Sequence, residues 1–194
     1  MNIIYLHGFQ SSALSVKGQQ FAHYCQHQTS HQVYLPDLNI EPAQALAKLS
    51  RLIEQLENVA LLGSSLGGFY ATQLVAEYAV PAVLINPAMR PWQLFRNLFG
   101  LDQIPYFVNE QWSLDAAQLD YLEQVAVPFV QNADKILVLL QEADEVLDYR
   151  EAQRYYSAHQ AASLIITEMH GSHAMENFSE KIPMIIEFLS HWQK

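Results

Sequence analysis

Short apolar runs alternate along this chain with longer amphipathic stretches. The runs are nearly continuous in Val, Ile, Leu and Tyr, which is typical of strands buried on both faces; they are residues 2–6, 32–35, 59–62, 82–85, 136–140 and 163–167. Between them, apolar residues recur at helical spacing, for example over 45–56, 66–78 and 182–189. This alternation predicts an α/β fold: a mostly parallel sheet of about six strands with helices on both faces.

The interval 87–134 breaks this alternation. It shows no strand pattern and is too long for a plain connection in a compact domain. We expect one domain, 1–194, in which 87–134 form a small helical cap over the sheet edge. The alternative is one ordinary crossover helix with a long loop. The segment holds an aromatic series and then a second helical pattern: Trp92, Phe95, Phe99, Tyr106, Phe107 and Trp112, followed by Leu119, Leu122 and Val125.

Composition narrows the function classes. With 51% hydrophobic and 15% charged residues, the 194-residue chain is expected to fold around one sizeable core. Its formal net charge of -10 argues against nucleic acid and anionic membrane surfaces as partners. The single cysteine, Cys25, lies in a predicted helix and is expected to be an inert thiol. No signal peptide and no apolar stretch of membrane-spanning length are visible, so we expect a cytoplasmic protein.

The segment Gly63-Ser64-Ser65-Leu66-Gly67 carries the strongest chemical signal. It fits G-x-S-x-G, follows an apolar strand and precedes a predicted helix, which is the context that a nucleophile elbow requires. Small residues on either side of the serine allow the sharp turn. Ser65 is therefore the candidate nucleophile, and Ser64 falls off the centre of the pattern. The alternative is a glycine-rich turn that binds an anion at the helix N-terminus.

The opening strand ends in Leu6-His7-Gly8-Phe9. Ligands bind where strands of an open parallel sheet reach their carboxyl ends, so this loop is expected beside the Ser65 turn. We predict that the backbone N–H groups of Phe9 and Leu66 form an oxyanion hole. For His7 we favour a structural role, in which the ring braces the loop by hydrogen bonding.

Two later loops offer an acid and a base. Asp144 and Asp148 both follow the 136–140 strand, but Asp148 has Glu151 three residues later at the head of a helical stretch, a capping arrangement. Asp144 is therefore the preferred acid; Asp148 and a merely solvated acidic loop are the alternatives. After the last strand, His173 is the preferred base, because it lies farther out along its loop than His170. We expect His170 to pack or hydrogen-bond at the strand end.

The resulting chain order is Ser, Asp, His, with each residue after its own predicted strand. This order is expected of the α/β-hydrolase arrangement and differs from those of the chymotrypsin and subtilisin types. No metal or cofactor is required by such a site. His23, His27 and His31 recur every four residues, but no carboxylate or thiol accompanies them at ligand spacing, so a solvated face is preferred to a metal site.

Several segments together resemble the YqiA-like esterases, which are small bacterial α/β-hydrolases. They cover nearly the whole chain in order: 5–9, 63–71, 86–88, 144–150 and 171–174. The resemblance implies an esterase acting on short-chain acyl esters, with acyl-CoA thioesters as the alternative substrate. It places the nucleophile on Ser65, the acid on Asp144 and the base on His173.

The sequence thus predicts a serine esterase whose partner is a small-molecule acyl ester. The aromatic series of the 87–134 segment suggests an apolar substrate wall, although we expect most of these residues to pack the cap on the core instead. The rival functions are a thioesterase with the same triad, a peptidase, and a hydrolase fold retained as a catalytically silent binding protein.

Overall fold

The main sheet is parallel throughout. The computed structural model describes residues 1–100, 104–158 and 162–192. Six strands pair in the order β2-β1-β3-β4-β7-β8, and every pairing is parallel. Their bounds are β1 (Asn2–Leu6), β2 (Gln32–Tyr34), β3 (Val59–Ser64), β4 (Ala82–Ile85), β7 (Ile136–Gln141) and β8 (Leu164–Glu168). Each predicted strand is present within two residues of its predicted bounds, so the α/β prediction is confirmed.

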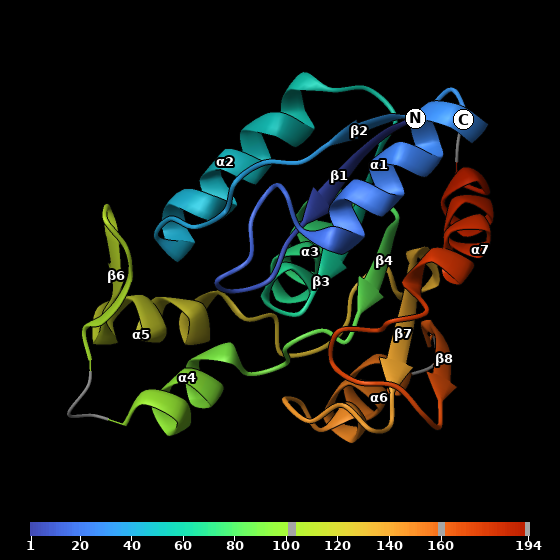
Figure 1. Ribbon diagram of the computed structural model, residues 1–194. Helices are drawn as coiled ribbons and strands as arrows, with labels where there is room; N and C mark the ends of the chain where they lie inside the picture. Colours follow the sequence, from blue (N-terminus) through green and yellow to red (C-terminus); the bar gives the residue numbers. More distant parts are fainter. Residues whose placement is uncertain (101–103, 159–161, 193–194) are drawn as a thin grey trace.

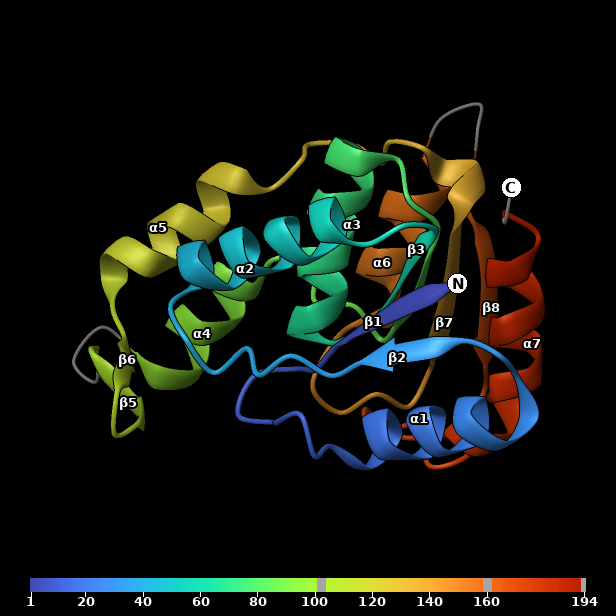
Figure 2. The same cartoon turned by 90° about the horizontal axis from the view of Figure 1, so that it is seen from above.

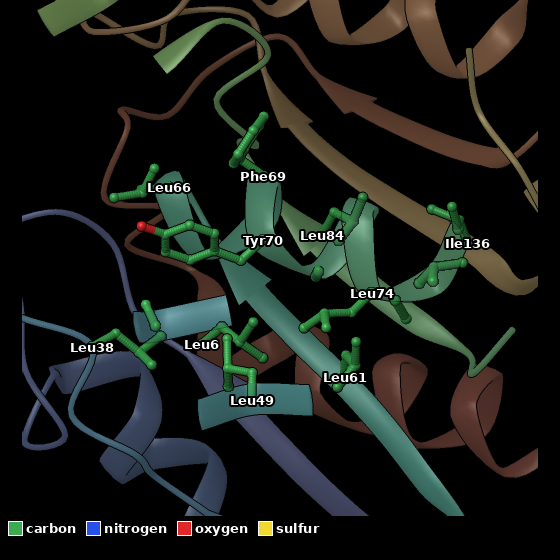
Figure 3. Packing of buried hydrophobic residues seen from close by; sticks show 14 of the residues in the cluster. Leu6, Leu38, Leu49, Leu61, Leu66, Phe69, Tyr70, Leu74, Leu84 and Ile136 are labelled. Carbon is green, nitrogen blue, oxygen red and sulfur yellow. The ribbon is translucent and has the colours of Figure 1, made fainter. Parts of the chain in front are cut away.

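Helices cover both faces of this sheet, as Figure 2 shows. One face carries α1 (Val16–Gln28) and α7 (Phe178–Ser190); the other carries α2 (Pro42–Gln55), α3 (Leu66–Tyr78) and α6 (Tyr149–Ser157). Successive strand residues point to opposite faces. In β1, Ile3 and Tyr5 join the core beneath α1 and α7, whereas Ile4 and Leu6 join the core around α3. Figure 3 shows this second core, in which α3 residues pack on strand side chains.

The segment between β4 and β7 differs from the prediction. It contains α4 (Pro91–Phe99), an antiparallel hairpin of β5 (Tyr106–Asn109) and β6 (Trp112–Leu114), then α5 (Ala116–Val125) and a 3₁₀ turn, Ala133–Lys135. Our expectation of no strand here was wrong, because strands of four and three residues are too short to establish a period of two. The single crossover helix is also excluded, since α4 and α5 are separate. In Figure 1, α4, β6 and α5 lie together to one side of the sheet; that this segment acts as a cap stays a prediction.

Cys25 lies on the buried face of α1, as expected of a structural thiol. Burial raises its pKa to about 11, because the apolar core disfavours the thiolate. The thiolate is the reactive form, so this cysteine is poorly suited to nucleophilic chemistry. Across the described residues, no helix has both the length and the apolar character needed to cross a bilayer.

Candidate active site

Ser65 occupies a sharp turn between β3 and α3. Its backbone is in a strained conformation, with φ 55° and ψ −119°. The glycines around it are required by close backbone approach: a Cβ on Gly63 would lie 2.5 Å from the Gly67 oxygen, and one on Gly67 would overlap the carbonyl group of Leu6. The strand, turn and helix that the G-x-S-x-G pattern predicts are therefore all present.

Neighbouring segments hold the Ser65 main chain in place. Its N–H donates to the Ile85 oxygen at 3.0 Å, and its oxygen accepts from the Ala88 N–H at 3.0 Å. On the other side, a Cβ on Gly8 would lie 3.1 Å from the Ser65 Cβ. The loop after β1 thus lies directly against Ser65, as the sheet order places β1 next to β3.

Asp144 and His173 form a hydrogen-bonded pair. The Asp144 Oδ2 lies 2.7 Å from the His173 Nδ1, and the carboxylate is 2% exposed. Its other oxygen accepts from the N–H groups of Val146 and Leu147, at 2.8 and 2.9 Å. These two amides orient the carboxylate toward the ring. An ionised carboxylate only accepts, so the ring donates from Nδ1 and its Nε2 is left as the proton acceptor.

Asp148 and His170, the alternatives to Asp144 and His173, lie in different surroundings. Asp148 is 41% exposed and caps α6, accepting from the N–H of Arg150 at 3.0 Å and from its Nε at 2.8 Å. These bonds hold the pKa of Asp148 below its usual value. The capping role predicted for it is confirmed. His170 is exposed just after β8 and its ring makes no hydrogen bond in the described part of the chain, so the expectation that it packs or hydrogen-bonds there was wrong.

Ser65 and His173 line the same cleft, which has a volume of about 750 Å³. No hydrogen bond joins the Ser65 hydroxyl to the His173 ring in the described part of the chain. Such bonds are often long or poorly aligned before substrate binds, so the shared cleft is the relevant observation. The structure therefore brings the three candidate triad residues to one edge of the sheet.

The two amides proposed for an oxyanion hole belong to segments that adjoin the Ser65 turn, the loop after β1 and the start of α3. Phe9 lines the cleft, and Leu66 begins α3 directly after Ser65. The first amides of a helix have no acceptor within it, which leaves the Leu66 N–H free for a ligand. His7 braces the β1 loop as predicted: its Nε2 accepts from the Leu38 N–H at 2.8 Å, and its Nδ1 lies 2.8 Å from the Gly8 oxygen.

The aromatic series between β4 and β7 packs internally. Phe9 contacts Phe95 at 4.5 Å and Trp112 at 6.1 Å between ring centroids, and Phe99 stacks on Tyr106 at 3.8 Å. None of the series belongs to the described lining of the cleft that holds Ser65 and His173, although Phe9 does. Packing therefore accounts for the buried members such as Phe95 and Trp112, whereas Phe107 is 65% exposed and neither packs in the core nor lines this cleft. The cleft is bounded instead by the loop after β1, the start of α1 and the histidine loop.

Comparison with known proteins places the chain in a family. Residues 2–190 match the Uncharacterised protein family UPF0227. The chain is a member of UPF0227. This is the YqiA-like family that the sequence motifs resemble, so that resemblance is confirmed.

Solved structures share the fold of this UPF0227 chain. The α/β hydrolase domain-containing protein 10 from mouse has a TM-score of 0.77 at 12% identity, covering 99% of this chain and 90% of the mouse protein. Est1E from Butyrivibrio proteoclasticus, solved with ferulic acid bound, has a TM-score of 0.73 at 14% identity, covering 98% and 88%. An esterase from Pyrococcus furiosus has a TM-score of 0.69 at 13% identity, covering 100% and 82%. The chain therefore has the α/β-hydrolase fold.

Sequence analysis missed several side chains that hold the histidine loop of this UPF0227 member. The Glu145 carboxylate accepts from the His173 N–H at 2.9 Å, and Glu176 accepts from the Ser172 hydroxyl at 2.5 Å. Lys17 donates from Nζ to the Ala174 oxygen at 2.7 Å. Burial lowers the pKa of Lys17, while the nearby acidic residues oppose that change. The only sequence signal for Glu145 was its position beside Asp144.

The two histidines of α1 lie against each other. His23 and His27 stack at 4.2 Å, and the His27 Nδ1 lies 2.8 Å from the His23 oxygen. Within residues 1–100, 104–158 and 162–192, no three His, Cys, Asp or Glu side chains are grouped to bind a metal ion.

Proposed function

We propose that this UPF0227 protein is a serine esterase that cleaves short-chain acyl esters through Ser65, His173 and Asp144. One observation carries the proposal: a buried carboxylate holds His173 in the tautomer that accepts a proton, in the cleft where Ser65 stands on a strained turn. A serine hydroxyl is a weak nucleophile unless a base removes its proton, and this arrangement supplies one.

In the acylation step, the Ser65 Oγ attacks the acyl carbonyl carbon while the His173 Nε2 takes the hydroxyl proton. The tetrahedral intermediate then collapses, the ester C–O bond breaks, and His173 passes the proton to the leaving alkoxide. Asp144 keeps its negative charge throughout; it orients the ring and stabilises the imidazolium that forms. The products are an alcohol and an acyl group on Ser65.

In the deacylation step, His173 removes a proton from a water molecule, which attacks the acyl-enzyme carbonyl. Collapse of this second intermediate releases the carboxylic acid and returns the proton to Ser65. In both steps the developing oxyanion is bound by the N–H groups of Phe9 and Leu66. Loss of one such donor costs about 3–4 kcal/mol of transition-state stabilisation.

The lining of the cleft supports an apolar acyl ester as the substrate. Leu14 is 78% exposed and Val16 is 73% exposed, so both offer apolar surface to a ligand. Both line the cleft with Ser65, together with Phe9, Ala174 and Met175. A volume of about 750 Å³ lies within the range of small-molecule sites, which is ample for a short acyl chain and its alcohol.

The proposal is tested by hydrolysis of p-nitrophenyl butyrate by the wild type, Ser65→Ala and Ser64→Ala at equal concentration. We expect turnover by the wild type, most of it retained in Ser64→Ala, and none above background in Ser65→Ala with unchanged circular dichroism. Equal rates in wild type and Ser65→Ala would refute the nucleophile.

Parallel assays with an acyl-CoA and an anilide separate the ester from the thioester and amide reactions, because the three differ in leaving group. Preference for acyl-CoA over the oxygen ester would move the assignment to a thioesterase with the same triad. Tight ligand binding without turnover of any of them would support a binding protein.

A further inference from the structure

Asn86 is a buried polar residue directly after β4, outside the triad. It is 2% exposed, and its backbone has a positive φ of 40°. Its amide side chain is bonded at both ends: the oxygen accepts from the Gln141 N–H at 2.9 Å, and Nδ2 lies 3.2 Å from the His173 oxygen and 3.4 Å from the Ser172 oxygen. Its own N–H donates to Leu139 at 2.9 Å.

These bonds join the segments that carry the acid and the base. Gln141 ends β7, and its oxygen accepts from the Asp144 N–H at 3.3 Å at the start of the acid loop. His173 carries the ring that pairs with Asp144. The Asn86 side chain therefore sets the distance between the main chain at the end of β7 and the main chain of the histidine loop.

The main chain of Ser65 is hydrogen-bonded to the residues that flank Asn86. Its N–H donates to Ile85, the residue before Asn86, and its oxygen accepts from Ala88, two residues after it. The turn at 85–88 thus contacts the nucleophile through its backbone and the other two triad segments through one side chain. A shift of this side chain would change the relative positions of acid and base, whereas the turn itself is anchored by the backbone.

The other contacts of the histidine loop are nearer to water. The bonds between Glu145 and His173 and between Glu176 and Ser172 involve exposed carboxylates, and the half-buried Lys17 donates to the exposed Ala174. Water competes for such bonds, so each contributes little to holding a loop. The loop also has irregular backbone, with φ of 124° at Gly171. The amide of Asn86, a buried residue, is better protected from water than these three contacts.

We infer that Asn86 is a positioning residue for the general base of this enzyme, an inference that rests on the proposed esterase function. It lies outside the lining of the cleft; it holds the His173 main chain so that the ring pairs with Asp144 in the cleft that holds Ser65. A misplacement of about 1 Å in such a site costs on the order of 10²-fold in rate. Its loss should therefore lower kcat and leave KM nearly unchanged.

Two substitutions separate this role from general stability. Asn86→Gly removes the amide but tolerates the positive φ. Asn86→Asp keeps the shape and the oxygen that accepts from Gln141, but it replaces the donor to the histidine loop by an oxygen. We expect kcat per active site, counted by stoichiometric labelling with a fluorophosphonate, to fall about 10- to 100-fold in both. We expect KM for p-nitrophenyl butyrate to stay within about 3-fold, because the substrate cleft is unchanged.

Asn132 provides the matched control. It also has a positive φ, 50°, and its Nδ2 donates to a backbone oxygen, that of Val75, at 3.0 Å. It lies before β7, at the amino end of the strand rather than at the acid loop. Asn132→Gly should lower the midpoint of urea unfolding while leaving kcat per labelled site within about 2-fold of wild type.

The outcomes are distinct. A kcat per labelled site within about 3-fold of wild type in Asn86→Gly or in folded Asn86→Asp would overturn the inference while leaving the esterase proposal standing. An equal fall in Asn132→Gly would also overturn it, because the effect would then follow stability alone. Wild-type protein with neither turnover nor labelling would contradict the esterase proposal itself, and this inference with it.

Discussion

Replacing Asp144 by Asn is the most informative change to the proposed triad, because it alters a tautomer without altering volume. Asparagine can keep its oxygen on the Val146 and Leu147 amides, where the Oδ1 of Asp144 now accepts at 2.8 and 2.9 Å. Its NH₂ group then faces the His173 Nδ1 in place of Oδ2. A donor in that position favours the ring tautomer with hydrogen on Nε2, which cannot accept the proton of Ser65.

The expected effect is a fall in kcat on the order of 10⁴-fold, as for the same change in other Ser-His-Asp triads. This corresponds to about 5.4 kcal/mol, at 1.36 kcal/mol for each factor of ten. The fold should persist, since the substitution is isosteric and keeps both amide contacts. KM should change little, because Asp144 does not line the cleft that holds Ser65.

The assay is initial-rate hydrolysis of p-nitrophenyl butyrate at neutral pH, with folded concentration checked by circular dichroism. Asp148→Asn is the matched control: it removes the charge from the α6 cap and from the pair with Arg150, both at the surface. It should leave kcat within about 2-fold and lower stability by about 1 kcal/mol or less. Asp144→Asn that retains kcat within 10-fold, or Asp148→Asn that loses it, would refute the reasoning.

Three further predictions concern the cleft, the turn and the pH dependence of stability. Leu14→Ser should lower kcat/KM more for p-nitrophenyl octanoate than for the acetate, because an exposed apolar wall is removed. Leu98→Ser, also exposed but outside the cleft, should change kcat/KM for neither ester. The same loss for both esters in Leu14→Ser would contradict this role. Gly67→Ala should lower the free energy of unfolding in urea by about 3 kcal/mol or more, because its Cβ would overlap the backbone at the end of β1; a smaller loss would show that the turn can relax. Lys181 contacts Glu168 and holds the pKa of that carboxyl below its usual value. The pair therefore stabilises the fold at pH values above the ordinary pKa of Glu. This contribution is lost as the pH falls and Glu168 is protonated. Lys181→Met should therefore cost up to about 1 kcal/mol at neutral pH and nothing in acid, and a loss of equal size at both pH values would exclude the ion pair as its cause.

The strands were predictable because each is buried on both faces and therefore reads as a continuous apolar run. Residues 82–85 illustrate this: all four are apolar and all four are buried between helices of opposite faces. The helix after Ser65 was equally clear, and Leu66–Tyr78 begins and ends where its pattern predicts. These signals are local, so one sequence is enough to read them.

The segment between β4 and β7 was not predictable in detail. Its hairpin pairs Tyr106 with Leu114 and has an irregular register near Asn109, so neither strand shows a clean alternation. The aromatic rings were ambiguous for a different reason. A tryptophan such as Trp112 can line a substrate site or fill a core, and the two are distinguished by its burial in the folded chain and its absence from the lining of the cleft.

The candidate triad was accessible from sequence because each member follows a predicted strand of a parallel sheet. Choosing Asp144 over Asp148 relied on recognising a helix cap, and the cap is present. Asn86 was part of a family motif, but nothing in its sequence context shows where its amide reaches. Its partners at 141 and 172–173 lie far along the chain, and only the fold brings them together.

The most direct test of the central claim is to find where an acylating or phosphonylating group attaches. Wild-type protein and the Ser65→Ala variant would be treated with a fluorophosphonate and analysed by intact mass and by peptide mapping. The account predicts one adduct per wild-type chain, located on Ser65, and no adduct on the variant. Labelling of another residue, or equal labelling of the variant, would contradict it.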